Sequence, residues 1–170
     1  MPTLPPWTLL LDGRPRLQGP EGRQQALEGL DAWLLAWLAL EGPTPRTRWM
    51  ALLWPDQAPD ATLRNRLRQR LFALKRRAGV EVVSGGETLA LGADVHWPGL
   101  DVAADTGSLL EMPPAGASPE LLEWRAGWRQ RQQAMRRDRL AAQSARLEHE
   151  GRLAEALLAA EALVAAEPLL

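Results

Sequence analysis

The chain has 170 residues, a formal net charge of -1 and 46% hydrophobic residues. This composition is typical of a globular protein with one ordinary domain or two small ones. It contains no cysteine and only two histidines far apart in the sequence, which excludes disulfides and structural zinc, and we expect neither a metal nor another cofactor.

No basic leader opens the sequence, and no run approaches the ~20 apolar residues that span a bilayer. We therefore expect no membrane partner and place the protein in the cytoplasm.

The positive charge is concentrated in one segment. Residues 44–79 contain nine Lys and Arg but only Asp56 and Asp60, whereas the remaining chain is acidic on balance. Because so few acids accompany these bases, salt bridges within a helix cannot neutralise them. A surface with this excess is typical of proteins that bind nucleic acid.

The chain begins with a predicted β-hairpin and a helix. Residues 7–18 contain two apolar runs around Asp12-Gly13, a pair that favours a hairpin turn. Within residues 22–42, Leu and Trp recur at steps of three and four, which predicts a buried helix that stops at Gly42-Pro43.

Two more helices and a second hairpin follow. Residues 44–56 predict a short helix with Thr44 as its N-cap, and residues 60–79 predict a longer one from a cap at Asp60 to Gly79. Residues 80–91 alternate around Gly85-Gly86, which favours a hairpin. The order hairpin, helix, helix, basic helix, hairpin is that of a winged helix-turn-helix.

The remaining chain predicts a second, helical unit. Residues 105–118 are rich in Pro and Gly, as linkers are, so we assign residues 1–104 to a first domain. Residues 119–170 predict one long helix, or two with a bend near Gly127, then a break at Gly151 and an Ala-rich helix, which together favour an antiparallel hairpin. Trp124 and Trp128 lie one turn apart and are expected to dock this hairpin on the first domain. The predicted fold is thus mainly α with small β.

The third predicted helix has two chemically different sides. At 100° per residue, one stripe collects the apolar residues Leu63, Leu67, Leu71, Leu74 and Ala78. The other sides carry amides and cations, which hydrogen-bond base edges or meet phosphates. We predict that residues 62–79 form a recognition helix that enters the major groove of double-stranded DNA. The candidate DNA-binding residues are Arg46, Arg48, Thr62, Arg64, Asn65, Arg66, Arg68, Gln69, Phe72, Lys75 and Arg76.

Three stretches carry a family resemblance: LLAWLAL at 34–40, LLWPD at 52–56 and LRQRLFALKRRAG at 67–79, with LDVAA at 100–104 closing the domain. Together they resemble the SARP/BTAD-type bacterial transcriptional activators, in which an OmpR/PhoB-like winged helix precedes a helical activation domain. The resemblance implies promoter binding, often to direct repeats, and contacts to RNA polymerase. It carries over Arg68, Gln69, Lys75 and Arg76 as recognition-helix residues.

Two features depart from that pattern. Asp31 stands where the family often has basic residues, and the predicted wing carries Glu81 and Glu87 with no Lys or Arg. An acidic wing would repel the phosphate backbone, so either binding rests on the third helix alone or the chain is a divergent member with weak DNA affinity.

The C-terminal hairpin resembles one tetratricopeptide repeat. Gly151, Leu153, Glu155, Ala156 and Pro168 lie at the repeat's offsets, whereas Ser144 and Ala160 replace its usual Gly and aromatic residue. One such unit cannot bury its apolar face alone. We expect it to pack on the first domain or on a second copy, which would give a homodimer through the C-terminal helices.

An enzymatic function has no support in the sequence. No paired carboxylates, nucleophile-base set or Gly-rich phosphate loop is recognisable. The alternative to a sequence-specific transcriptional regulator is a protein-interaction adaptor with a degenerate winged helix. The acidic wing and the outward-facing aromatic side chain of Phe72 favour that alternative.

Overall fold

The computed structural model describes residues 7–27, 29–100, 109–110 and 115–166, and LDVAA at 100–104 falls almost wholly outside them. The described residues form a mixed α/β structure with five α-helices and two small sheets. The sequence of elements is β1 (Trp7–Leu10), β2 (Arg16–Gln18), β3 (Gln24–Ala26), α1 (Gly29–Glu41), β4 (Thr44–Pro45), α2 (Arg46–Leu53), α3 (Ala61–Ala78), β5 (Val83–Ser84), β6 (Thr88–Leu91), β7 (Val95–His96), α4 (Pro119–His149) and α5 (Leu153–Ala166).

The first sheet has the order β3-β2-β1-β7. Strands β1 and β2 pair antiparallel around the predicted turn, and Gly13 adopts a positive φ of 73°. Strand β7 lies parallel to β1 on its other side and was not predicted. The chain therefore returns to its own N-terminal strand after the second hairpin, which closes the unit around a common core.

The predicted first helix was wrong at its beginning. Helix α1 starts at Gly29, whereas Gln24–Ala26 form β3 and pair with β2, with Gln25 opposite Leu17. The apolar period of the helix begins only at Leu27, and the polar Gln24 and Gln25 have nothing to bury. Pairing along β2 satisfies their backbone groups instead.

The predicted cap of the second helix was also wrong. Thr44 lies in β4, opposite Leu89 of β6, and Pro45 holds the N-cap position of α2. The Thr44 hydroxyl accepts a 3.0 Å hydrogen bond from Trp37 Nε1 and donates one of 3.0 Å to the Gly42 carbonyl. It therefore ties α1 to the turn after it and does not cap α2.

Helix α3 matches its prediction closely. The Asp60 carboxylate accepts a 2.9 Å hydrogen bond from the Leu63 backbone N–H at the start, and Gly79 ends the helix with a φ of 74°. The buried residues of the helix are Leu63, Leu67, Leu74 and Ala78, and Leu71 packs against the core from its edge. The predicted apolar stripe is confirmed.

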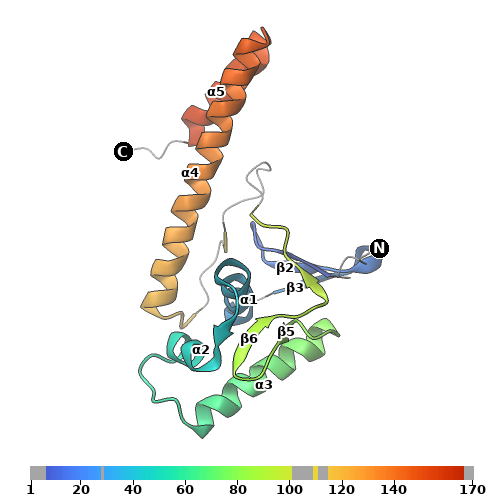
Figure 1. Cartoon of the computed structure of the whole chain (residues 1–170), viewed down its shortest axis with the longest axis vertical. Coiled ribbons are helices and arrows are strands. Elements are labelled where there is room, and N and C mark those ends of the chain that lie inside the picture. The colour runs from blue at the N-terminus through green and yellow to red at the C-terminus, as the bar shows by residue number, and fades with distance from the viewer. Residues whose placement is uncertain (1–6, 28, 101–108, 111–114, 167–170) are drawn as a thin grey trace.

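The second hairpin joins β4 in the sheet β4-β6-β5. Its strands pair with Val83 opposite Leu91, as the alternation around Gly85-Gly86 predicted. A Cβ atom on Gly85 would lie 1.9 Å from the Thr88 carbonyl oxygen, so the turn requires glycine there. The hairpin lies beside α3 at one end of the molecule (Figure 1).

Helix α4 is one continuous helix through Gly127, and its first turn is capped by Ser118. After a turn at Gly151, α5 runs back along the far half of α4, with the Ser144 hydroxyl donating a 3.3 Å hydrogen bond to the Ala156 carbonyl. Figure 1 places α3 and α5 at opposite ends of the molecule. None of the helices in the described residues combines the length and hydrophobicity needed to cross a bilayer.

The near half of α4 packs on the core formed by α1 to α3 and the sheets. Leu121 is fully buried there, and Trp124 and Trp128 pack against the same cluster, so their predicted docking role is confirmed. Leu109 and Leu110, within the segment predicted as a linker, are also buried. The Gln132 side chain links this segment to the turn after β1. Its amide oxygen accepts a 3.0 Å hydrogen bond from the Leu109 N–H, and its amide nitrogen donates one of 2.6 Å to the Asp12 carboxylate.

The one buried acid of α1, Asp31, anchors α3. Its carboxylate, 7% exposed, accepts hydrogen bonds from Arg70 at 3.2 Å and from Arg77. The two arginines lie seven positions apart, which places them on one edge of α3. A buried carboxylate needs such partners to offset its lost hydration.

We predict that Asp31→Ala lowers the free energy of unfolding by about 2 kcal/mol, because it removes two charge-assisted hydrogen bonds between α1 and α3. Urea denaturation measures the change. Glu123→Ala is the control, since Glu123 is exposed on α4, and it should stay within about 0.5 kcal/mol of the parent. Equal effects of the two substitutions would contradict the anchoring role.

Candidate nucleic-acid interface

The side of α3 away from its buried stripe is open to solvent. Nine candidate residues lie on this side and are all exposed: Thr62, Arg64, Asn65, Arg66, Arg68, Gln69, Phe72, Lys75 and Arg76. They lie together because burial of Leu63, Leu67 and Leu74 fixes the rotation of the helix about its axis. We call this exposed surface the α3 face.

The cations of α3 differ in their partners. Arg70 and Arg77 are paired with Asp31, and Lys75 lies 3.8 Å from Glu81 of the segment before β5. Both members of the Lys75 pair are more than half exposed, so that contact is weak in water. Arg64, Arg66 and Arg76 form no ion pair with any residue that the structure describes.

The polar groups of the α3 face are partly ordered. Arg68 donates a 2.8 Å hydrogen bond to the side-chain amide oxygen (Oδ1) of Asn65, one turn earlier. This contact holds the planar guanidinium along the helix while its remaining N–H groups stay available. Asn65 keeps its two amide donors free for an outside acceptor.

A groove of about 500 Å³ runs between α2, α3 and the β5–β6 turn. Arg46, Arg64 and Arg68 line it, and Glu87 is the one acid among its lining residues. Three guanidiniums against one carboxylate give the groove a net positive charge, which favours an anionic ligand over a cationic one.

Arg46 forms one wall of the groove but is not free. Its guanidinium donates to the Gly86 carbonyl and, at 3.3 Å, to the Gly85 carbonyl, and its backbone N–H donates to Glu87 at 2.8 Å. These contacts fix the second hairpin against the N-terminus of α2. Arg46 therefore both shapes the groove and adds charge to it.

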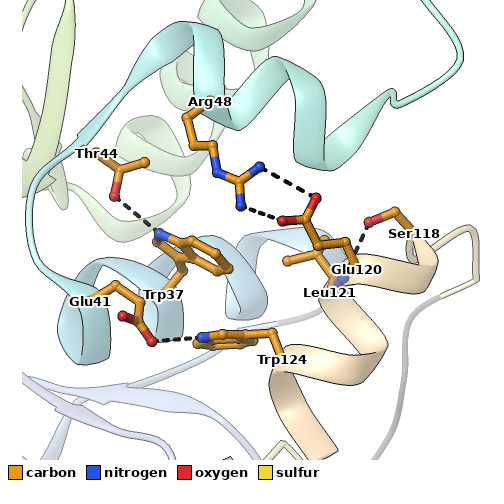
Figure 2. A network of polar contacts seen from close by, with 8 residues as sticks. All are labelled: Trp37, Glu41, Thr44, Arg48, Ser118, Glu120, Leu121 and Trp124. Atoms are coloured by element: carbon orange, nitrogen blue, oxygen red, sulfur yellow. Dashed lines mark hydrogen bonds and ion pairs between the residues drawn. The ribbon is translucent and has the colours of Figure 1, made fainter. Parts of the chain in front are cut away.

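The structure gives Arg48 a partner from outside the α3 face. Its guanidinium pairs with the Glu120 carboxylate in the first turn of α4 and lies 5.7 Å from the centre of the Trp37 ring. Figure 2 shows the pair of Arg48 with Glu120, and it shows Trp124 of α4 on the side of Trp37 away from Arg48. Arg48 does not line the groove, and its role in DNA binding stays a prediction.

Around Arg48, tryptophans of three helices pack together. The ring centre of Trp37 lies 5.0 Å from that of Trp124 and 5.8 Å from that of Trp49, and Glu41 accepts 2.8 Å hydrogen bonds from the indoles of Trp124 and Trp128. The one-turn spacing of Trp124 and Trp128 predicted their packing, but nothing in the sequence indicated that Glu41 would accept their hydrogen bonds.

Two further arginines hold the buried segment at Leu109 and Leu110. Arg129 donates to both carbonyls, and Arg125 donates to Leu110 at 2.9 Å while its guanidinium lies 5.2 Å from the Trp33 ring centre. Burial, with a smaller contribution from neighbouring Arg129, lowers the pKa of Arg125. These two cations therefore stabilise the fold.

The described residues contain no group of three or more His, Cys, Asp or Glu that could hold a metal ion. Comparison of the chain with protein-family models, with curated proteins and with solved structures gave no match.

We predict that Trp124→Ala lowers the free energy of unfolding by about 2 to 3 kcal/mol, because it empties the space between the Trp33 and Trp37 rings. The matched control is Leu122→Ala, an exposed apolar residue two positions earlier on α4, which should change it by less than about 0.5 kcal/mol. Chemical denaturation compares the two. A change for Trp124→Ala as small as that of the control would mean that α4 is not held by this cluster.

Proposed function

We propose that this protein is a sequence-specific DNA-binding transcriptional regulator in which α1, α2, α3 and the β5–β6 hairpin act as a winged helix-turn-helix. The observation that carries the proposal is the α3 face: one continuous exposed side of an 18-residue helix that combines unpaired arginines with Gln69 and Asn65. An α-helix fits the major groove, and these side chains match its acceptors.

The chemistry divides the α3 face into two roles. Gln69 and Arg76 lie on its centre line, where they would reach base edges, and the edges carry cations suited to phosphates. Arg64, Arg66, Arg68 and Lys75 are those cations, with Thr62 at the N-terminal end of the helix. Because Lys75 lies near Glu81, the negative charge beside β5 is partly offset, which reduces the repulsion expected of an acidic wing.

A role in transcription would also give the protein partners other than DNA. A regulator of the SARP/BTAD type, which this chain resembles in the motifs around Trp37, Trp54 and Arg68, would act in the bacterial cytoplasm and touch RNA polymerase when bound at a promoter. The α4–α5 unit is then a tetratricopeptide-like module for protein contacts. Its match at Pro168 lies outside the described residues.

We predict a steep salt dependence of DNA affinity. If α3 and its neighbouring residues make about five phosphate contacts, log affinity falls against log salt with a slope of about -4 to -5, and Arg64→Ala or Arg66→Ala makes the slope shallower by about one unit. Fluorescence anisotropy with a duplex library measures it. Arg23→Ala, which removes the same charge from an exposed site near β3, should leave the slope unchanged. An unchanged slope in the α3 variants would remove these residues from the phosphate set.

We predict a different effect at the centre of the face. Gln69→Ala or Arg76→Ala should reduce discrimination between the selected site and random DNA by about 1 to 3 kcal/mol, since each loses a base contact. Selection and sequencing of bound duplexes gives the site, and competition with random duplex gives the discrimination. Equal weakening on both DNAs would refute the base-reading role.

A protein-interaction adaptor is the second candidate, and one observation favours it. Phe72 is 66% exposed in the middle of the α3 face, where a lone aromatic needs a partner to be buried. A thymine methyl group or an apolar patch on a protein would each serve. Absence of duplex binding even at low salt would assign α3 to a protein partner and reject the regulator.

A further inference from the structure

Helix α5 leaves an apolar side uncovered. Ala156 and Ala159 face α4, whereas Leu153, Leu157 and Val164 are 60 to 70% exposed. At 100° per residue these three side chains fall within about 40° of one another, so they form one stripe along the helix. We call it the α5 stripe. Glu161 lies at its edge, one turn after Leu157.

Helix α4 carries a groove of about 360 Å³ that matches this stripe. Its lining residues are Arg139, Ala142, Gln143 and Arg146. The small side chain of Ala142 leaves room between the two arginines, and Met135, 40% exposed, extends the same side of α4 by one more turn. The groove offers apolar contact at its floor and positive charge at its walls, whereas the α5 stripe offers large apolar side chains and a carboxylate.

The stripe and the groove cannot meet within one chain. Helices α4 and α5 are antiparallel, and their mutual contacts run through Leu147, Ser144 and Ala156. At 100° per residue from these contact residues, the groove lies on one face of the α4–α5 pair and the α5 stripe lies on the opposite face. The two surfaces are therefore available to different neighbours.

We propose that the α5 stripe of one chain packs into the α4 groove of a second copy of this chain, in a head-to-tail contact. An antiparallel register that sets Leu157 over Ala142 of the second copy also brings Val164 to Met135 and Glu161 to Arg139. Size, hydrophobicity and charge are matched at once in this register. Glu161 and Arg139 form no ion pair with any described residue of their own chain, so both are available.

A contact between different surfaces has no two-fold axis and does not close after two copies. Each added chain presents a new stripe and a new groove. The contact is distant from α3 at the other end of the molecule and needs no DNA (Figure 1). It therefore stands independently of the proposed regulator function.

The test measures the mass of the 170-residue chain by sedimentation velocity over about a hundredfold range of concentration, without DNA. The parent protein should form a growing series of dimer, trimer and larger species. Leu157→Glu should weaken the association constant by more than about tenfold, because it places a charge in the apolar stripe. Leu158→Glu is the matched control: Leu158 is equally exposed and adjacent, but lies on another side of α5, so association should persist.

Charge reversal tests the partner surface. A protein with Glu161→Arg alone, or with Arg139→Glu alone, should stay monomeric. In each variant, positions 161 and 139 of neighbouring copies carry charges of the same sign and repel. An equimolar mixture of the two variants should associate again, since every stripe then meets a groove of opposite charge. Circular dichroism of each variant verifies that α4 and α5 remain helical.

Several results would overturn the proposal. They are a monomeric parent protein at every concentration, equal losses in the Leu157 and Leu158 variants, and no recovery in the mixture. A dimer that saturates without larger species would replace the head-to-tail contact with a closed one, and would overturn it as well.

Discussion

The orientation of α3 is the constraint on which the rest of the structure depends. Leu63, Leu67 and Leu74 are each at most 3% exposed, and their burial determines which side of the helix faces the core. Apart from the buried Ala78, every other side chain of α3 must then lie toward solvent or along an edge. A helix with seven basic residues can fold in a nearly neutral protein only because its one apolar stripe is continuous.

The cations on the two edges of α3 have different surroundings: those on one edge stabilise the fold, and those on the other line an open groove. On one edge, Arg70 and Arg77 offset the buried charge of Asp31 and hold α3 to α1. On the other edge, Arg64 and Arg68 line the groove that Arg46 closes from α2. Asp31 thus has a structural role: its carboxylate pairs with two arginines that would otherwise repel their neighbours along the same helix.

Helix α4 links two ends of the molecule with different surfaces. Its first half is held by aromatic packing around Trp37 and Trp124, and by the pair of Arg48 with Glu120 (Figure 2). Its second half packs against the small side chains of Ala156 and Ala159, and four large apolar side chains of α5 stay exposed: Leu153, Leu157, Leu158 and Val164. The core and the α3 face therefore lie at one end, and an unfilled apolar surface lies at the other.

The sequence by itself determined the elements whose signals are local. The stripe and caps of α3, the Gly85-Gly86 hairpin and the docking tryptophans of α4 all follow from spacing and from side-chain chemistry within a few residues. The exposed candidates of the α3 face follow too, because a helical wheel needs no tertiary information once one apolar stripe is identified.

Only the tertiary structure decided what depends on partners distant in sequence. Strands β3, β4 and β7 are too short and too polar to be recognised, and they exist because β2, β6 and β1 pair with them. Thr44 bonds Trp37 and does not cap α2, and Arg48 meets Glu120, because the fold brings those side chains within reach. Spacing alone predicts the side of an element on which a residue lies, whereas its partner is set by the packing of the whole chain.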